Sequence, residues 1–294
     1  MDEKRRKTNS HLNPRNAKVN FAAVLVAVWS FFLVVCPAVY IVVLSFLTRE
    51  NRNIVFKFTT ENYERIVDPL YLHIYVNSLI IALIASLAAL LIGYPFAYFT
   101  AQLRKSARYT VLLFIMLPFW TSSLLRIYGW KTLLQNDGVF NTILLKLGFI
   151  GEPQSMLGSF GAVLAGTVYM LLPLMIMPIY NSADKVDASL TEASRDLGAG
   201  RIKTFFNITL PLTAPGIAGG VTLVFIPAVG LFFISDLLGG AKTMLLGNLI
   251  ESQVKSIGNK PFAAALSVVM ALMVVVFVFI FRKISAKYEK NMGQ

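Results

Sequence analysis

Charged side chains crowd one short segment in the middle of an apolar sequence. Eight ionisable residues lie between Asp184 and Lys203, with a long apolar run on either side. At a bilayer centre each would cost about 2.5–3.5 kcal/mol, so the segment must lie outside the hydrocarbon. Its composition fits either a plain connecting loop or an amphipathic helix that contacts another protein. Residues on one face recur at the spacing of a helix: Val186, Leu190, Ala193 or Ser194, and Leu197.

Two glycines divide this segment. Gly198 and Gly200 interrupt the predicted helix and permit a sharp turn. Residues 201–208 then form a second short helix, and Pro211 suits the first turn of the next apolar run. The pattern therefore predicts a helix–glycine–helix element.

A second set of residues has the chemistry to meet a cation. Asp236 ends an apolar run, and an acid near membrane depth is a functional candidate. An ordinary interfacial carboxylate is the alternative. Aromatic faces attract cations by roughly 0.5–2 kcal/mol, but aromatic residues also gather at membrane interfaces. The aromatic candidates are Phe119, Trp120, Tyr128, Tyr169 and Phe232.

Catalytic and metal-binding patterns are missing from the sequence. The stretch GAGRIKT (198–204) has a Lys-Thr pair but lacks the glycine that a phosphate-binding loop requires before the lysine. The two histidines, His11 and His73, are far apart in the sequence. No residue is therefore assigned a catalytic or metal-binding role.

Composition indicates an integral membrane protein. Only 14% of the 294 residues are charged, against about 25% in soluble domains. Six apolar runs are long enough to cross about 30 Å of hydrocarbon at 1.5 Å per residue. We therefore predict an all-α membrane protein with six spans, the third interrupted by Pro118. The runs cover about 21–47, 77–101, 109–127, 160–182, 210–235 and 262–282.

The basic residues follow the predicted topology. With the N-terminus inside, 17 of the 27 Lys and Arg fall on the inner side, so both termini are predicted to be cytoplasmic. This distribution accounts for the net charge of +12 without nucleic-acid binding. The predicted organisation is a basic cytoplasmic tail (1–18), one transmembrane domain (19–288) that contains the charged segment (about 184–211), and a short C-terminal tail (289–294).

The charged segment resembles a known signature. It reads Glu192-Ala193-Ser194, three residues, Gly198, nine residues, then Ile208-Thr209-Leu210-Pro211. This is similar to the EAA signature of permease subunits of ABC importers, with Ser194 in place of alanine. The resemblance implies a type I importer permease fold with a cytoplasmic coupling helix between spans four and five, which docks on an ATPase subunit. The coupling residues it implies are Leu190, Glu192, Ala193, Ser194, Leu197 and Gly198.

Further stretches resemble the permeases of polyamine importers. They are PLYLHIYVNSL (69–79), GYPFAYF (93–99), LPFWTSSLLRIYGW (117–130), YMLLPLMIMPIY (169–180) and GLFFISDLLGGAKTMLLGNLI (230–250). The resemblance implies a spermidine and putrescine pathway in the bacterial inner membrane, shared with a second homologous permease. It also implies two ATPase subunits, which bind the ATP and magnesium, and an extracytoplasmic polyamine-binding protein.

Two alternatives remain open at this point. One is the permease of another ABC importer, for sulfate, iron, phosphonate or sugar. The other is a stand-alone secondary carrier, which would need intramembrane ionisable residues for ion coupling. Only Asp236 comes near membrane depth.

Overall fold

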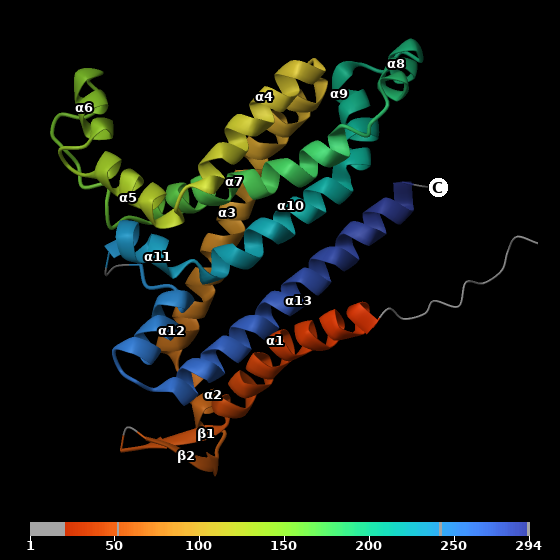
Figure 1. The fold of residues 1–294 in the computed structure, drawn as a ribbon. Helices are drawn as coiled ribbons and strands as arrows, with labels where there is room; N and C mark the ends of the chain where they lie inside the picture. Colours follow the sequence, from red (N-terminus) through yellow and green to blue (C-terminus); the bar gives the residue numbers. More distant parts are fainter. Residues whose placement is uncertain (1–20, 52, 241–242, 293–294) are drawn as a thin grey trace, which may run out of the picture.

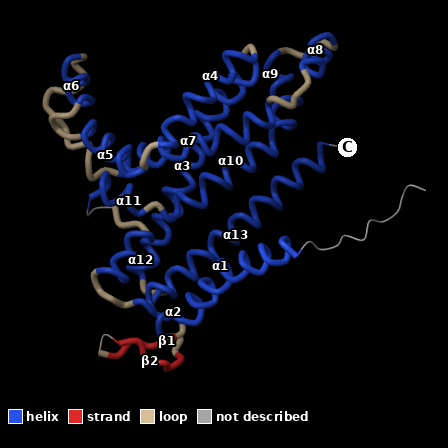
Figure 2. Tube along the Cα trace, in the orientation of Figure 1, coloured by secondary structure: helices blue, strands red, loops and turns tan. Residues whose placement is uncertain are grey.

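The structure, a computed structural model, describes residues 21–51, 53–240 and 243–292. Helices dominate it, and two strands form one hairpin (Figures 1 and 2). The predicted basic tail, 1–18, lies outside the described residues. In chain order the elements are α1 (Phe21–Ser45), β1 (Leu47–Glu50), β2 (Asn53–Phe58), α2 (Glu61–Ile66), α3 (Pro69–Gln102), α4 (Lys105–Met116), η1 (Leu117–Trp120), α5 (Ser123–Leu134), α6 (Val139–Lys146), α7 (Phe160–Ala183), α8 (Ala188–Asp196), α9 (Arg201–Thr204), η2 (Phe205–Thr209), α10 (Leu210–Gly230), α11 (Phe232–Ile234), η3 (Ser235–Gly239), α12 (Leu246–Lys255) and α13 (Lys260–Met292).

Five described helical stretches are long and apolar enough to cross a membrane. They correspond to five of the six predicted runs, and a bent helix pair supplies a sixth if it is counted as one span. The stretches are Val24–Ser45, Pro69–Gln102, Phe160–Ala183, Arg201–Gly230 and Lys260–Lys283.

The third predicted span is bent. Lys105–Trp120 and Ser123–Lys146 meet at 94°. Pro118 lies in the short η1 turn, and Thr121 beyond it has extended backbone, so the hydrogen-bond ladder cannot continue. The boundaries predicted for this span, 109–127, are therefore wrong, although Pro118 correctly indicated an interruption.

The packed centre of the fold is formed by α3, α7 and α10. Glycines let α10 approach α7 closely. A Cβ atom at Gly216 would lie 2.6 Å from the Pro178 carbonyl oxygen, and one at Gly220 would lie 2.7 Å from Met175 Sδ. Between membrane helices, close backbone approach replaces the hydrophobic effect as a source of association.

Buried polar contacts fix the helices against one another. The hydroxyl groups of Tyr94 on α3 and Thr213 on α10 lie 2.9 Å apart. The hydroxyl of Tyr75, also on α3, donates to the Leu266 carbonyl of α13 at 3.0 Å. A buried polar group without a partner would cost about 1–3 kcal/mol, so these bonds specify one packing arrangement.

Two of the spanning helices begin at side-chain caps. The Asp68 carboxylate accepts a hydrogen bond from Leu70 N at 2.9 Å, and Pro69 takes the first position of α3. The Ser159 hydroxyl accepts from Ala162 N at 3.1 Å at the start of α7. Both starts therefore have local sequence causes.

The β1–β2 hairpin was not predicted and adds one small antiparallel sheet to the helical fold. It follows α1 directly and lies at one end of the bundle, whereas α8 and α9 lie at the other (Figure 1). We call these the hairpin end and the α8 end.

We predict that Gly216→Ala loosens the α7–α10 contact. The new methyl group meets backbone, which cannot rotate away, so overpacking should cost about 1–3 kcal/mol. Thermal unfolding of the detergent-solubilised protein measures this cost. Gly129→Ala is the control, because a Cβ at Gly129 meets no atom within 4 Å. Equal midpoints for the two variants would contradict the packing account.

Candidate functional site

The predicted helix–glycine–helix element is present at the α8 end. Asp187 caps α8 by accepting a hydrogen bond from Ser189 N at 3.0 Å. This bond holds the pKa of the Asp187 carboxyl below its ordinary value, so the negative charge persists beside the helix N-terminus. The helix ends at Leu197, and Gly198 has a φ of +83°. That left-handed conformation reverses the chain toward α9.

Hydrogen bonds hold this turn closed. Gly198 N donates to Arg195 O at 2.9 Å, and Ala199 N donates to Ser194 O at 3.1 Å. The hydroxyl groups of Ser194 and Thr204 lie 3.1 Å apart and join α8 to α9. Ser194 therefore contributes to the inside of the element, and the signature alanine that it replaces has no such hydroxyl.

The element presents apolar side chains to the outside. Leu197 is 89% exposed and Ile202 is 76% exposed, and Leu190 and Phe206 are also exposed. The carboxylate-bearing Glu192 is exposed on the same helix, as is Ala193. This segment is too polar to lie in hydrocarbon, yet it exposes a group of apolar side chains beside a charge. Such a combination is common on surfaces that bind another protein. We call these exposed residues the docking surface.

One arginine ties this element to the bundle. Arg108 on α4 forms an ion pair with Asp184, which caps the end of α7 just before α8. The same guanidinium donates to the Ala101 carbonyl of α3 and lies 5.9 Å from the centroid of the Tyr180 ring. A cavity of about 450 Å³ separates this junction from α8. Sequence reasoning missed the pair, since its members are 76 positions apart.

The predicted cation-binding residues have different surroundings, and only Asp236 and Phe232 share a hydrogen-bond partner. Phe119 lines a cavity of about 310 Å³ with Leu231 and Phe233. The Arg126 guanidinium lies 5.5 Å from the Phe119 ring centroid, so that aromatic face already has a cation against it. Neighbouring Trp120 is 84% exposed and lies outside this cavity.

Asp236 lies in the η3 turn, and the Asn248 amide donates both to its carboxylate and to the Phe232 carbonyl, the latter at 3.0 Å. Asn248 thereby brings Asp236 and Phe232 together. Nothing in the local sequence pattern indicated this partner, because Asn248 comes from α12, beyond the Gly239–Gly240 turn.

The last two aromatic candidates come from α5 and α7, both of which contact η3. The Tyr169 ring packs against Trp130, with ring centroids 5.5 Å apart. Tyr128 is exposed on α5. Among the described residues, no group of three or more His, Cys, Asp or Glu side chains is arranged to hold a metal ion.

The fold and the α8 element define a class of membrane transport protein. Residues 89–292 match the family described as binding-protein-dependent transport system inner membrane component, and the chain belongs to this family. It is therefore a multi-pass inner-membrane protein of a transport system. The predicted fold class and permease family are confirmed.

Particular relatives are similar over nearly their whole length. The chain is 47% identical over 266 residues to the spermidine/putrescine transport system permease protein PotB of Escherichia coli (strain K12), covering 89% of this chain and 97% of the relative. It is 42% identical to PotB of Haemophilus influenzae, covering 92% and 94%.

The solved structure of a bacterial ABC transporter that imports the acidic polysaccharide alginate has the same fold. Its TM-score is 0.74 at 17% identity, covering 92% of this chain and 95% of that one.

We predict that the Arg108–Asp184 pair holds α4 against α7. Arg108→Asp should raise amide hydrogen exchange in α4 and at residues 184–187, by up to about tenfold for a partly exposed pair. The double variant Arg108→Asp with Asp184→Arg restores the attraction and should bring exchange back toward the parent. Failure of the exchanged pair to recover any protection would show that the charges do not hold the junction.

Proposed function

We propose that this chain is the permease subunit of an ATP-driven polyamine importer, with spermidine and putrescine as cargo. The observation that carries the proposal is the 47% identity to a spermidine/putrescine permease over 97% of that relative. It forms the pathway together with a second, homologous permease subunit. Two ATPase subunits bind and hydrolyse ATP, and an extracytoplasmic binding protein delivers the polyamine.

The docking surface supports a mechanical role for α8. Leu190 and Leu197 would insert into an ATPase subunit, and Glu192 would pair with one of its basic groups. From α9 the chain continues through η2 into α10, and Arg201–Gly230 is one helical stretch. A displacement of α8 by the ATPase therefore reaches the bundle along α10, as a rigid-body movement driven by differential contacts in two states.

The α8 end faces the cytoplasm in this proposal, with both chain termini on the same side. The excess of Lys and Arg in the segments on that side supports the orientation. The hairpin end then faces the external binding protein and the outer leaflet.

A polyamine is a flexible chain of ammonium groups, and its pathway needs carboxylates, carbonyls and aromatic faces. Asp236, beside Phe232, would supply a carboxylate. The Phe119 ring could contact a polyamine only if Arg126, which lines the same cavity and lies against that ring, moved away. Trp120 and Tyr128 remain candidates at exposed positions, and Tyr169 remains one although its ring packs against Trp130. Affinity in the pathway should be modest, because the external binding protein supplies the tight site.

We predict that Gly198→Asp abolishes uptake while the protein stays in the membrane. A side chain at a φ of +83° is strained by about 1–2 kcal/mol, which should open the turn and misplace Leu197. Gly200→Asp is the matched control, because Gly200 has a φ of −66° at a helix N-cap, where aspartate is favoured. Uptake by reconstituted vesicles and their ATP hydrolysis report the result. Normal coupling in Gly198→Asp would refute docking through this turn.

We predict that vesicles containing the full complex take up labelled spermidine, but not sulfate, and only with ATP. Asp236→Asn should lower spermidine uptake by about tenfold, the effect of losing one charge-assisted contact. Asp137→Asn, an exposed acid elsewhere, should leave uptake unchanged. Sulfate uptake would assign the chain to another importer class, and ATP-independent uptake would favour a secondary carrier.

A further inference from the structure

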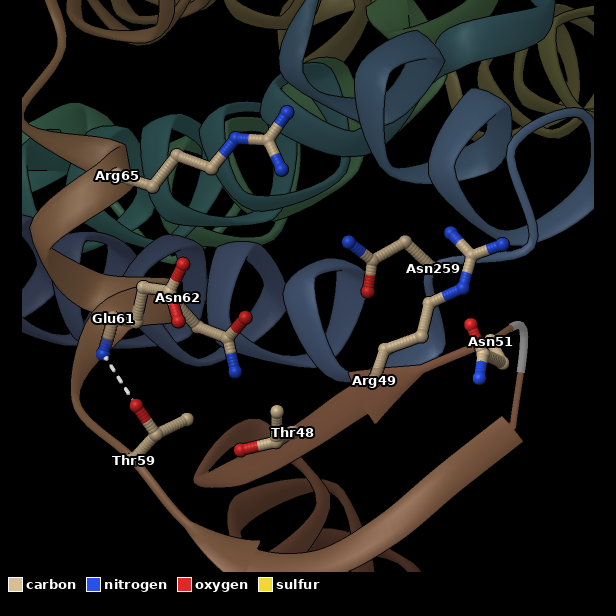
Figure 3. Close-up of a pocket in the computed structure, with 8 residues that line it drawn as sticks. All are labelled: Thr48, Arg49, Asn51, Thr59, Glu61, Asn62, Arg65 and Asn259. Atoms are coloured by element: carbon tan, nitrogen blue, oxygen red, sulfur yellow. Dashed lines mark hydrogen bonds between the residues drawn. The ribbon is translucent and has the colours of Figure 1, made fainter.

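A polar cavity of about 350 Å³ lies at the hairpin end, apart from the residues discussed above. Its walls come from three places in the chain: the β1–β2 hairpin with the residues that follow it, α2, and the residue before α13. Figure 3 shows Arg65 extending from α2 and Arg49 rising from β1, with Asn259 between them in this view.

Two guanidinium groups give the cavity a positive charge. Neither Arg49 nor Arg65 forms an ion pair with a residue that the structure describes. Glu61 is the single acidic residue among the lining residues, so the lining carries a net positive charge.

The Arg65 guanidinium is held in place by its neighbours. It lies 4.6 Å from the centroid of the Phe262 ring and donates to the Tyr71 hydroxyl at 3.0 Å. The guanidinium also lies 5.6 Å from the centroid of the Tyr71 ring, and its other N–H groups donate to no residue that the structure describes. Arg49 lies against the loop before α13, where a Cβ at Gly258 would be 3.7 Å from Arg49 Nη2.

The frame around these groups is well connected. The Asn62 amide donates to the carbonyls of Ser45 and Leu47, both at 2.9 Å, and so fastens α2 to the start of the hairpin. Asn259 O accepts from Ala263 N at 3.0 Å in the first turn of α13. A site built on such a frame is preformed, which lowers the entropic cost of binding.

The cavity lies where two lipid-facing helices end. α1 ends at Ser45 and α13 begins at Lys260, and the two helices pack side by side (Figure 1). The most apolar stretch of α1 is 0% buried and that of α13 is 17% buried, so both present apolar side chains outward. The cavity at their common end is therefore at the level of the lipid headgroups.

We propose that this cavity binds the phosphate of a phospholipid headgroup, with Arg49 and Arg65 as its ligands. Guanidinium forks match phosphate oxygens in geometry and charge, and their bonds to phosphate are among the strongest in proteins. A recess of about 350 Å³ suits a headgroup, whereas docking a folded protein requires a broad surface. The site depends on the orientation proposed above only for the choice of leaflet, and it is independent of the polyamine cargo.

The test is lipid retention by the purified complex of this chain with its partner subunits. The delipidated complex is incubated with phosphatidylglycerol in detergent, and native mass spectrometry counts the lipids that remain bound. Arg49→Gln with Arg65→Gln should lower retention at least about tenfold. Lys57→Gln is the control, because it removes an exposed cation of the same hairpin that does not line the cavity.

Two single variants separate binding from folding. Arg49→Gln removes a guanidinium that takes part in no described aromatic stack and should lower retention while the thermal midpoint stays at the parent value. Arg65→Lys keeps the charge but loses the fork, so it should retain an intermediate amount of lipid.

Three results would overturn the proposal. The first is equal lipid retention by the parent and the double arginine variant. The second is binding of inorganic phosphate that added phosphatidylglycerol does not displace, which would indicate a soluble anion as the ligand. The third is an effect of the arginine variants only on affinity for the external binding protein, which would make the cavity part of that interface.

Discussion

Hydrocarbon offers no hydrogen-bond partner to a peptide group, and this constraint governs the whole structure. It makes the spans helical and confines irregular backbone to places where protein supplies the missing bonds. The η3 turn shows how this is done: the Ser235 hydroxyl donates to the Thr243 carbonyl, and Asn248 donates to Phe232 O. The same constraint places the hairpin and α8 at the two ends of the bundle. The parts of the chain that meet water or other proteins are therefore also the parts with turns, strands and short helices.

Close packing makes the α7–α10 contact rigid. In α10, Gly216 and Gly220 let the backbone lie directly on α7, with the Met175 side chain fully buried between them. A joint of this kind resists sliding, because the two backbones approach closely and Met175 fills the remaining space. The α8 element is connected to α10 through the chain and to α4 through Arg108 and Asp184. The α8 element is therefore joined to the bundle in two ways, one covalent and one electrostatic.

Features that depend on neighbouring residues in the sequence were predicted, whereas contacts between residues far apart in the sequence were missed. The turn at Gly198 was predicted because a glycine between two helical patterns has few other uses, and the structure gives it a positive φ. Pro118 indicated an interruption, but it did not indicate the 94° angle between the two halves of the span, which depends on how α5 packs against its neighbours. The alternation of Ile54, Phe56 and Phe58 was a strand signal that the apolar spans around it obscured. Neither the Arg108–Asp184 pair nor the Asn248 bond to Asp236 has a signature at its own position. The contacts of the predicted pathway residues were therefore not predictable from the sequence.

The position of α1 has a consequence for how the chain is made. Its neighbour in the bundle is α13, which follows the other described helices in the chain, and none of the most apolar stretch of α1 is buried. During translation α1 must therefore enter the bilayer and remain there with no helical partner. Its mean hydropathy of 2.5 over that stretch permits this, because partitioning alone stabilises such a segment. The α1–α13 pairing can then form only after the described spans between them have been synthesised.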